Sequence, residues 1–381
     1  MIQERPVVIS IGYGRHLFSE GNHERERMIR CAKETKHLYL LIFTSAHDKL
    51  ERQKVSDTLT LCPTGSHFKL TQLWNAYQRA AKLVRSNKND RVIITTQDPF
   101  EAGLAGYLLK MRYGIPLTVQ EHADAFSSSF WRNETIGNRA RYILGKYLLQ
   151  KADVVRVVSK RSEETMKRLS LRAEITRLPV AIDTHTFEGV QSLTPDSIDE
   201  FWLLSVARFV PQKNIPLMLR AFTTAYQTNT HLRLRLVGQG PEQKKIEQLI
   251  QQLFPKMTKE QLPIKIEPWS NDVAALMRRS QAYVLSSNYE GWARVLIEAV
   301  LCELPIVTTD VGCAGEVIIN EKFGLVVPVN EQAALTEAIL RISTDQKTYQ
   351  IIKENLRNII RDELPGTRID FYGNDWIATL E

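Results

Sequence analysis

The sequence predicts an α/β fold of two doubly wound parallel-sheet domains. Its 381 residues are more than one ordinary hydrophobic core organises, so two domains are expected. Short apolar runs alternate with longer amphipathic stretches along the whole chain, which is typical of parallel strands separated by covering helices. The hydrophobic content of 43% and the charged content of 24% are those of a soluble globular protein.

Each half of the chain is expected to hold about six strands. In the first half they are predicted at Val7–Ile11, Leu38–Phe43, Val92–Thr95, Leu117–Gln120, Val154–Val158 and Ile175–Leu178. In the second half they are predicted at Trp202–Val206, Leu232–Val237, Ile264–Glu267, Ala282–Ser286, Ile306–Thr309 and Leu325–Val327. Amphipathic stretches such as Leu73–Arg85 and Ala102–Arg112 predict helices between the strands.

A polar segment that contains a proline, EGVQSLTPDSIDE, predicts a domain boundary near Phe187–Glu200. We therefore assign residues 1–187 to a first domain and residues 188–364 to a second. The tail Ile369–Glu381 predicts a final helix within about 365–381 that packs back on the first domain. Four large side chains of the tail recur at roughly helical spacing: Phe371, Tyr372, Trp376 and Leu380.

Positive charge is concentrated in the first domain. Residues 1–187 hold 30 Lys and Arg against 19 Asp and Glu, whereas residues 188–381 hold 20 against 24. This asymmetry predicts either an anionic partner for the first domain or a charge excess scattered over solvated helix faces. Nucleic acid is not expected as a partner, because the chain has no nucleic-acid-binding motif and no basic patch interleaved with aromatic residues.

The sequence predicts no membrane span, no metal and no disulfide framework. No apolar run reaches the ~18 residues of a spanning helix, and MIQERPVVISIG is typical of a first strand, not of a signal peptide. The cysteines have no paired spacing, so we expect a reducing cytoplasm. They are Cys31, Cys62, Cys302 and Cys313.

In open parallel sheets ligands bind beyond the carboxyl ends of the strands, so the turns after the strands are candidate sites. Arg208 and Lys213 follow the first predicted strand of the second half, where two cations beside a helix start suit a diphosphate. Gly238 and Gly240 follow the next strand and allow a tight turn close to a ligand. Solvated cations and an ordinary turn would give the same patterns.

The segment AYVLSSNYEGWARVLIE, Ala282–Glu298, carries the strongest pattern. A strand leads into a loop with Glu290, and Glu298 lies eight residues on, inside the next helix. The two carboxylates can accept hydrogen bonds from sugar and ribose hydroxyls, while amides at the helix start point at phosphate oxygens. The alternative is that both acids cap local amides. The candidate ligand-binding residues between them are Gly291, Trp292, Ala293 and Arg294.

Together with the following turns, this region resembles glycosyltransferase family 4, whose members have the GT-B fold of two Rossmann-like domains facing across a cleft. The resemblance is dense from about Leu203 to Val329. It matches the family's E-x7-E motif to Glu290 and Glu298, and its phosphate-binding Arg and Lys to Arg208 and Lys213. A later glycine-rich turn matches at Gly312 and Glu316. Three positions depart from the family's usual glycine: Asn214, Ala293 and Cys313.

The resemblance is looser in the first half. Gly12 and Gly14 stand where the family has its N-terminal glycine loop, and they also suit an ordinary strand–helix turn. His122 follows the strand LTVQ at the position of a family histidine that reaches the donor sugar. A lone histidine is more often structural, but this one is predicted at the carboxyl end of a strand.

The resemblance implies a retaining, metal-independent transferase that needs no cofactor. It would move a hexose-type sugar from a nucleotide-diphosphate sugar, of UDP or GDP type, to a glycan or lipid-linked acceptor. Arg208 and Lys213 would neutralise the leaving diphosphate, and Glu290 and His122 would orient the sugar. Because Glu290 and Lys213 lie on turns, we expect their replacement to leave the fold nearly unchanged. A catalytically silent GT-B partner subunit and a sugar-nucleotide epimerase are the alternatives.

The charge asymmetry extends this prediction to a cytoplasmic enzyme that binds peripherally to the anionic inner face of the cell membrane. Peripheral binding needs only a handful of basic residues near the surface. The candidates are Arg132, Arg139, Arg141, Lys146, Lys151, Arg156, Lys160 and Arg161.

Overall fold

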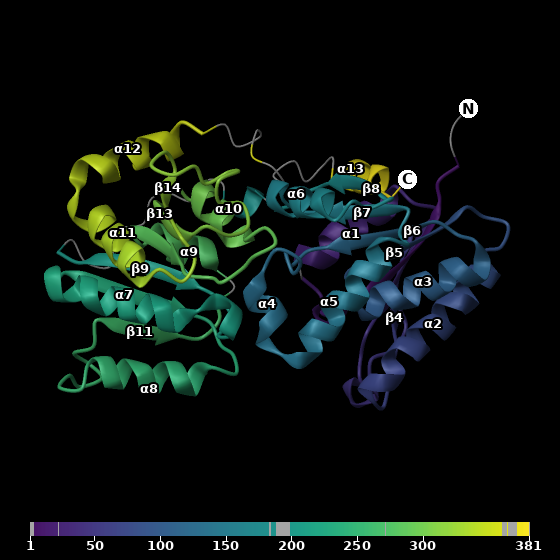
Figure 1. Ribbon diagram of the computed structural model, residues 1–381, viewed down its shortest axis with the longest axis horizontal. Helices are drawn as coiled ribbons and strands as arrows, with labels where there is room; N and C mark the ends of the chain where they lie inside the picture. The colour runs from purple at the N-terminus through teal and green to yellow at the C-terminus, as the bar shows by residue number, and fades with distance from the viewer. Residues whose placement is uncertain are drawn as a thin grey trace. The chain divides into compact units, whose positions relative to one another are not determined.

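The computed structural model describes residues 4–21, 23–182, 184–187, 199–270, 272–359, 364 and 372–380. They form two compact units, Met1–Ala181 with Arg368–Glu381 (unit 1) and Ile182–Thr367 (unit 2). The chain passes from one unit to the other after Ala181, and residues 188–198 of the predicted boundary lie outside the described residues. Each unit contains one mainly parallel sheet with helices on its faces, so the predicted fold class is confirmed (Figure 1).

The sheet of unit 1 has eight strands in the order β3-β4-β2-β1-β5-β6-β7-β8. All neighbours are parallel except β3, which runs antiparallel to β4. The strands are β1 (Val7–Gly12), β2 (His37–Ile42), β3 (Gln53–Lys54), β4 (Leu59–Pro63), β5 (Val92–Thr96), β6 (Leu117–Glu121), β7 (Val154–Val157) and β8 (Glu174–Arg177).

The prediction of six strands in the first half was wrong, because β3 and β4 were missed. Strand β3 has only two residues, and no α-helix separates β2 from β4, so the strand–helix alternation on which the prediction rested is interrupted here. Strand β4 nevertheless has every residue buried, which places it inside the sheet beside β2.

The helices of unit 1 cover both faces of its sheet. Helices α2 and α3 pack together on one face, while α1 and α13 pack together on the other (Figure 1). The helices are α1 (His23–Lys33), α2 (Lys69–Ser86), α3 (Glu101–Tyr113), α4 (Ser129–Glu134), α5 (Ile136–Leu149), α6 (Lys160–Arg168) and α13 (Tyr372–Ala378), with short 3-10 turns η1 (Arg15–Phe18) and η2 (Ala46–Asp48).

The sheet of unit 2 is wholly parallel, in the order β11-β10-β9-β12-β13-β14. All six of its strands were predicted to within one residue at each end. They are β9 (Phe201–Val206), β10 (Leu232–Val237), β11 (Ile264–Glu267), β12 (Ala282–Leu285), β13 (Ile306–Thr309) and β14 (Gly324–Val327). The helices are α7 (Ile215–Thr228), α8 (Gln243–Leu253), α9 (Val273–Arg278), α10 (Arg294–Leu301), α11 (Gln332–Thr344) and α12 (Gln346–Arg357), with 3-10 turns η3 (Thr184–Phe187) and η4 (Pro211–Lys213).

The strand order of each sheet reverses at one point. In unit 1 the chain runs outward from β1 to β2 and β4, then returns to add β5 on the other side of β1. In unit 2 it runs from β9 to β10 and β11, then returns to add β12 beside β9. At such a point the loops leaving the two central strands diverge, which opens a crevice at their carboxyl ends. The two reversal points therefore mark where a ligand is expected.

The predicted terminal helix is α13, which packs on α1 in unit 1. Tyr372, Trp376 and Leu380 are buried in the same apolar cluster as residues of β1, β2 and β4, whereas Phe371 lies outside the described residues. The Cβ of any residue replacing Gly373 would lie 3.0 Å from the Arg30 backbone oxygen, so α13 approaches α1 closely.

Arg156 holds this region together from inside the sheet. Its guanidinium donates to Gln120 Oε1 at 2.6 Å, to the Leu178 carbonyl at 3.0 Å and to the Tyr372 hydroxyl at 2.8 Å. The side chain is buried, so the prediction that Arg156 contributes to a basic surface was wrong. Three hydrogen bonds offset the loss of hydration of the buried charge.

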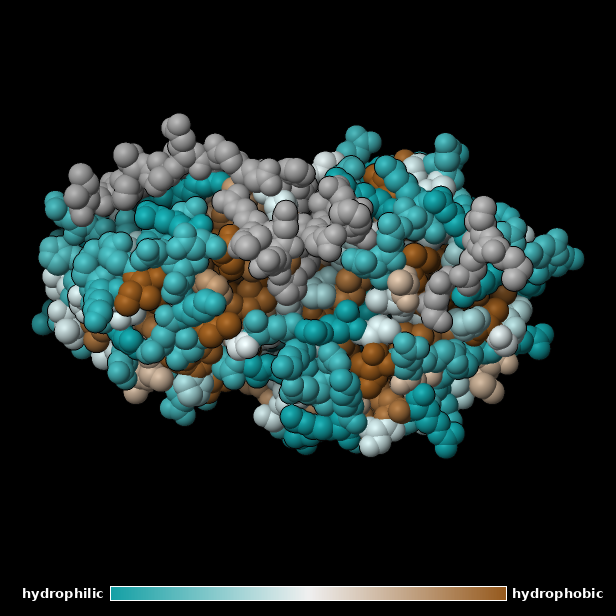
Figure 2. Space-filling view, turned by 90° about the horizontal axis from the view of Figure 1, so that it is seen from above, coloured by the Kyte–Doolittle hydropathy of each residue, from teal (hydrophilic) through white to brown (hydrophobic). Residues whose placement is uncertain are grey.

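The surface is mainly polar. Hydrophilic residues cover most of the face shown in Figure 2, and hydrophobic residues reach it in scattered patches. Among the described residues, no helix is both long and apolar enough to cross a bilayer. Nor does the described part of the chain bring three or more His, Cys, Asp or Glu side chains together in a group that could hold a metal ion.

We predict that Trp376→Ala lowers the unfolding free energy of unit 1 by about 3–5 kcal/mol, because it empties a large buried volume. Urea unfolding of the whole chain, followed by circular dichroism, should show the unit 1 transition moving while that of unit 2 stays in place. Trp74→Ala is the control, since Trp74 is 55% exposed on α2 and its removal should change stability by less than about 0.5 kcal/mol. Equal effects of the two substitutions would contradict the packing of α13.

Candidate functional site

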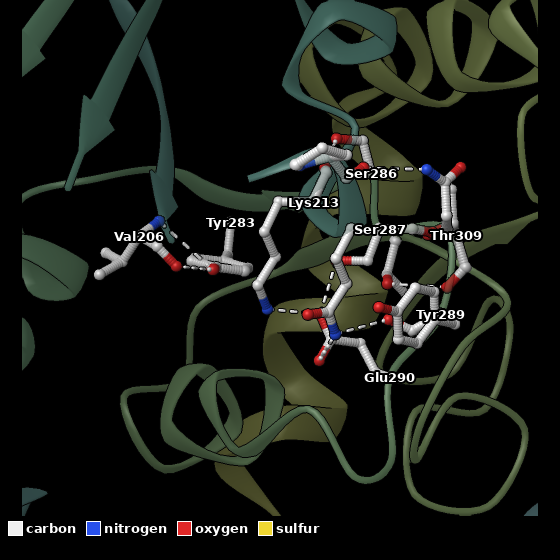
Figure 3. A network of polar contacts seen from close by, with 12 residues as sticks. Val206, Lys213, Tyr283, Ser286, Ser287, Tyr289, Glu290 and Thr309 are labelled. Atoms are coloured by element: carbon white, nitrogen blue, oxygen red, sulfur yellow. Dashed lines mark hydrogen bonds and ion pairs between the residues drawn. The ribbon is translucent and has the colours of Figure 1, made fainter. Parts of the chain in front are cut away.

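The reversal point of the unit 2 sheet is spanned by an ion pair between Lys213 and Glu290 (Figure 3). Lys213 ends the turn η4 that follows β9, and Glu290 lies in the loop that follows β12, so the pair joins two neighbouring strands. The side chains are only 15% and 9% exposed. Burial strengthens their attraction and also makes either charge costly to leave alone.

Lys213 and Glu290 were expected to be replaceable with little effect on the fold because they lie on turns. Their burial contradicts the reason for that expectation. Ser287 Oγ donates to Glu290 Oε1 at 2.6 Å, and Ser287 itself is fully buried at the end of β12 (Figure 3). Thr309 Oγ1 donates to the Ser287 carbonyl at 2.8 Å and so ties the loop to β13. The carboxylate of Glu290 is thus held in one orientation by Lys213, which follows β9, and by Ser287, which follows β12.

Further hydrogen bonds connect the two loops directly. Gln212 Nε2 donates to the Tyr289 carbonyl at 3.0 Å, and the Asn288 backbone N–H donates to the Gln212 carbonyl at 2.8 Å. Ser286 Oγ donates to the Lys213 carbonyl at 2.9 Å. These hydrogen bonds therefore fix the loop that carries Lys213 against the loop that carries Glu290.

The turn from β12 into α10 buries Gly291, Trp292 and Ala293. Ala293 precedes the first residue of α10 with φ 59°, in the left-handed region that glycine favours. Alanine thus adopts the backbone that the family's usual glycine would adopt here. The helix amides keep their direction, at a cost of roughly 1 kcal/mol relative to glycine.

The later glycine-rich turn packs against this same turn. Gly312 has φ 59°, and a Cβ there would lie 2.8 Å from the Trp292 carbonyl carbon and oxygen. The backbone N–H of Cys313 donates to the Trp292 carbonyl at 3.0 Å. Cys313 is fully buried, and this burial raises the pKa of its thiol, so it acts as a small packing residue.

Glycine is required at the turn after β10 because the loop of Arg208 packs closely against it. A Cβ on Gly238 would lie 1.9 Å from the Ala207 carbonyl oxygen, and one on Gly240 would lie 2.4 Å from the Phe209 carbonyl oxygen. The loop of Arg208 therefore packs closely against both glycines, and the approach of a ligand to this turn stays a prediction. The glycines also fix the loop in which Arg208 lies.

Arg208 and Glu298 differ in their surroundings. Arg208 lies exposed just beyond β9, and the described residues give its guanidinium no acidic partner. Glu298 is the fifth residue of α10, half-buried, with its Oε1 3.6 Å from an Arg294 nitrogen. Unit 2 thus combines an accessible cation, a buried ion pair and a second carboxylate on the helix that follows β12.

The reversal point of the unit 1 sheet carries the predicted glycine loop. A Cβ on Gly12 would lie 2.4 Å from Gln97 Oε1, and the N–H of Tyr13 donates to that oxygen at 3.0 Å. Gly14 has φ 132°, which only glycine adopts easily, and precedes η1. Gln97 follows β5, so it connects the loops of the two central strands, as the Lys213–Glu290 pair does in unit 2.

His122 follows β6 and is half-buried. Its Nε2 lies 2.9 Å from Gln120 Oε1, which also accepts a hydrogen bond from Arg156. Burial, reinforced by repulsion from Arg156, lowers the pKa of His122 to about 3. The imidazole therefore stays neutral near pH 7, and in this arrangement Nε2 carries the proton.

Sequence analysis missed two buried carboxylates beside His122. Glu121 Oε1 accepts hydrogen bonds from the Ala123 and Ala125 amides at 3.1 and 3.0 Å. Asp124 accepts hydrogen bonds from Ser127 and Ser162. Burial raises the pKa of both carboxyl groups. These contacts fix the loop after β6, in which His122 lies.

The residues that support Glu290 were also missed. Ser287, Gln212 and Thr309 are polar residues at or just beyond strand ends, and this position is the only signal for them in the sequence. The predicted site residues fall into two groups: Gly12, Gly14 and His122 in unit 1, and the other nine in unit 2. Within unit 2, the structure brings Lys213 and Glu290 into direct contact and packs Gly238 against the Arg208 loop.

Comparison with known proteins agrees with this arrangement. Residues 26–181 match the family model of the glycosyl transferase 4-like domain, and residues 196–359 match that of glycosyl transferases group 1. An uncharacterized glycosyltransferase of Methanocaldococcus jannaschii is 26% identical over 287 residues, which are 75% of this chain and 74% of the relative. The two family models together cover well over half of the chain.

Two further proteins are similar over all or part of the chain. One is a Campylobacter jejuni N-acetylgalactosaminyltransferase named for a diphospho-undecaprenol acceptor, 25% identical over 58% of this chain and 60% of its own length. The other is Anabaena HepE, whose structure was determined in complex with UDP and glucose. It superposes with a TM-score of 0.73 over 99% of both chains at 17% identity, which shows a shared fold. The chain is therefore a glycosyltransferase whose first part matches the glycosyl transferase 4-like domain and whose second part matches glycosyl transferases group 1.

Proposed function

We propose that this glycosyltransferase moves a hexose-type sugar from a nucleotide-diphosphate sugar to a glycan or lipid-linked acceptor, with retention of configuration and without a metal ion. The observation that carries the proposal is the meeting of Lys213 and Glu290 at the reversal point of the unit 2 sheet. A cation and a hydroxyl-binding carboxylate stand side by side there, as a sugar joined to a diphosphate requires.

In this proposal Arg208 and Lys213 bind the diphosphate, and the amides at the start of α10 add partial positive charge. Their role is to stabilise the negative charge that grows on the leaving group, for which other enzymes use a metal ion. Glu290 accepts hydrogen bonds from the sugar hydroxyls, and Glu298 accepts them from the ribose. The neutral His122, whose Nε2 proton is bonded to Gln120, accepts a hydrogen bond from a sugar hydroxyl at Nδ1 or donates to the sugar from its backbone N–H.

Retention is proposed from the resemblance to family 4. The acceptor oxygen attacks the anomeric carbon from the face that the diphosphate leaves. The bond from that carbon to the diphosphate oxygen breaks, the new glycosidic bond forms, and the acceptor's proton passes to the leaving phosphate oxygen. No carboxylate of this chain forms a covalent intermediate in this scheme.

The donor is proposed to carry uridine or guanosine, and HepE, with its UDP complex, supports uridine. The acceptor named for the Campylobacter relative supports a lipid-linked diphosphate. Together with the basic charge of residues 1–187, this favours a cytoplasmic protein associated peripherally with the membrane.

We predict that UDP or GDP raises the melting temperature of the purified protein, because a ligand that binds only the folded state stabilises it. A thermal-shift series with UDP, GDP, ADP and dTDP identifies the base. The Arg208→Gln variant should lose most of the shift, whereas Arg220→Gln, which neutralises an exposed arginine on α7, should keep it. No shift with any of the four nucleotides would contradict a nucleotide-sugar donor.

We predict that Glu290→Gln reduces transfer by roughly 100-fold or more, since it removes a fixed charge from the reaction centre. It should also lower stability by about 1–3 kcal/mol, because Lys213 then loses its partner. The double variant Lys213→Met/Glu290→Gln should regain stability but not activity. Turnover and urea unfolding are measured on all variants.

Glu267→Gln is the matched control for this experiment. Glu267 is another carboxylate of unit 2 that is paired with a cation, since its Oε1 lies 2.8 Å from Arg235 Nε. It lies at the end of the edge strand β11. The variant should lose stability without losing transfer. Near-normal turnover of Glu290→Gln would remove Glu290 from the site.

We predict that the product keeps the anomeric configuration of the donor and forms at full rate in EDTA, because cationic side chains take the place of a metal. Proton NMR of the reaction mixture reports the anomeric coupling constant and the rate together. An inverted product would overturn retention, and a loss of rate reversed by magnesium or manganese would overturn metal independence. Nucleotide binding without transfer to any acceptor would instead favour a silent partner subunit.

A further inference from the structure

Helix α5 exposes an apolar stripe to solvent. Ile136, Ala140, Ile143 and Tyr147 recur at helical spacing, so they lie along one face of the helix. Ile136 is 86% exposed, Ile143 71% and Tyr147 50%. The opposite face, with Asn138, Gly145, Leu148 and Leu149, is buried in unit 1. A helix with apolar residues on both faces is expected to bury the second face against a partner.

Basic side chains border this stripe. Arg139 and Lys146 lie next to it on α5, Arg132 lies on α4, and Lys151 follows the end of α5. Among the described residues none of the four has an acidic partner. Residues 129–151 hold five basic residues against one acidic residue, Glu134. The charge of the predicted basic surface is therefore concentrated here.

The other four candidates for the basic surface do not border the stripe. Arg156 is buried, and Arg141 turns away from the stripe to pair with Glu101 at 2.7 Å. Lys160 and Arg161 lie on α6.

Aromatic rings hold several of the remaining cations at the edges of the helix. Lys146 Nζ lies 5.7 Å from the centre of the Tyr142 ring, and Arg132 lies 5.3 Å from the same ring. Lys151 Nζ lies 5.3 Å from the ring of Tyr147. Tyrosines beside cations, next to exposed isoleucines, are typical of a helix lying in a membrane interface.

We propose that α5, with the adjoining basic residues of α4 and the α5 end, docks this protein on an anionic lipid bilayer. The isoleucines enter the boundary between headgroups and acyl chains, and the four unpaired cations contact phosphate headgroups. A bilayer fits better than a protein partner, because the exposed apolar side chains project from a stretch with five basic residues and only one acidic residue. This inference deepens the lipid-linked-acceptor part of the proposed function and rests on it.

Co-sedimentation of the full chain with vesicles tests the proposal. The wild-type protein should bind phosphatidylglycerol-containing vesicles at low salt, bind less at high salt, and not bind pure phosphatidylcholine vesicles. Arg139→Gln/Lys146→Gln should weaken binding by roughly 30-fold, about fivefold per charge. Ile136→Gln/Ile143→Gln should weaken it by about tenfold or more, because two apolar anchors are lost.

Matched controls remove the same groups from unit 2. Ile319→Gln/Ile351→Gln replaces two isoleucines that are 44% and 45% exposed, and Lys256→Gln/Lys259→Gln neutralises two exposed lysines. Both should bind vesicles as the wild type does. Absence of wild-type binding to anionic vesicles at low salt, or equal binding by the α5 variants, overturns the proposal. So does a dimer in sedimentation that the isoleucine variant converts to a monomer, since a second copy then occupies the stripe.

The proposed function is followed separately in the same variants. Their nucleotide-induced melting shifts and their donor turnover with a soluble acceptor should equal those of the wild type, because α5 carries none of the proposed donor-binding residues. Vesicle binding without a nucleotide-induced rise in melting temperature would support the docking surface and contradict the proposed nucleotide-sugar donor. A nucleotide shift without vesicle binding would do the reverse.

Discussion

The buried pair of Lys213 and Glu290 is the interaction on which the organisation of unit 2 depends. It lies where β9 and β12, adjacent in the sheet, send their chains to different faces. A gap at this place would expose backbone ends and leave the loops free to move apart. The ion pair, the Ser287 hydroxyl and the crossed contacts of Gln212 and Asn288 close it. In the proposed function, the same atoms that join these two loops contact the ligand, and they are already in place before it binds.

In unit 1 the loops of the two central strands are joined by a neutral side chain instead of an ion pair. Gln97 uses one side-chain oxygen to hold the backbone of Tyr13, and the space for that oxygen exists only because residue 12 has no side chain. His122 of the same unit is neutral as well, since burial, reinforced by repulsion from Arg156, lowers the pKa of its imidazole.

The sequence predicted the parts of this molecule that follow from regular patterns. Short runs rich in Val, Ile and Leu identified every strand of unit 2, although charged residues interrupt β10 (LRLRLV) and β11 (IKIE). Such runs are expected of parallel strands covered on both faces. Strands β3 and β4 at one edge of the unit 1 sheet were not predicted. Strand β3 is too short to show a pattern, and no α-helix separates β2 from β4. Charge counting placed Arg156 on a surface, because composition does not distinguish a solvated guanidinium from one enclosed by Gln120, Leu178 and Tyr372. The glycines after β10 predicted a close approach to a ligand, whereas their packing against carbonyls of the Arg208 loop could not be predicted from the sequence. Motifs located the site, but only the fold identifies which side chains face it.

The packing of α13 on α1 has a consequence for how the chain is made. During translation, β1 to β8 leave the ribosome first, yet the apolar cluster they share stays incomplete until Tyr372, Trp376 and Leu380 arrive. All of unit 2 is synthesised in between. The nascent first unit must therefore wait with an uncovered apolar face and with Arg156 lacking its hydrogen bond to Tyr372, while the second unit already has its full sequence. The order in which the two units mature is then the reverse of their order in the gene, and the uncovered face is where chaperones are expected to act on the growing chain.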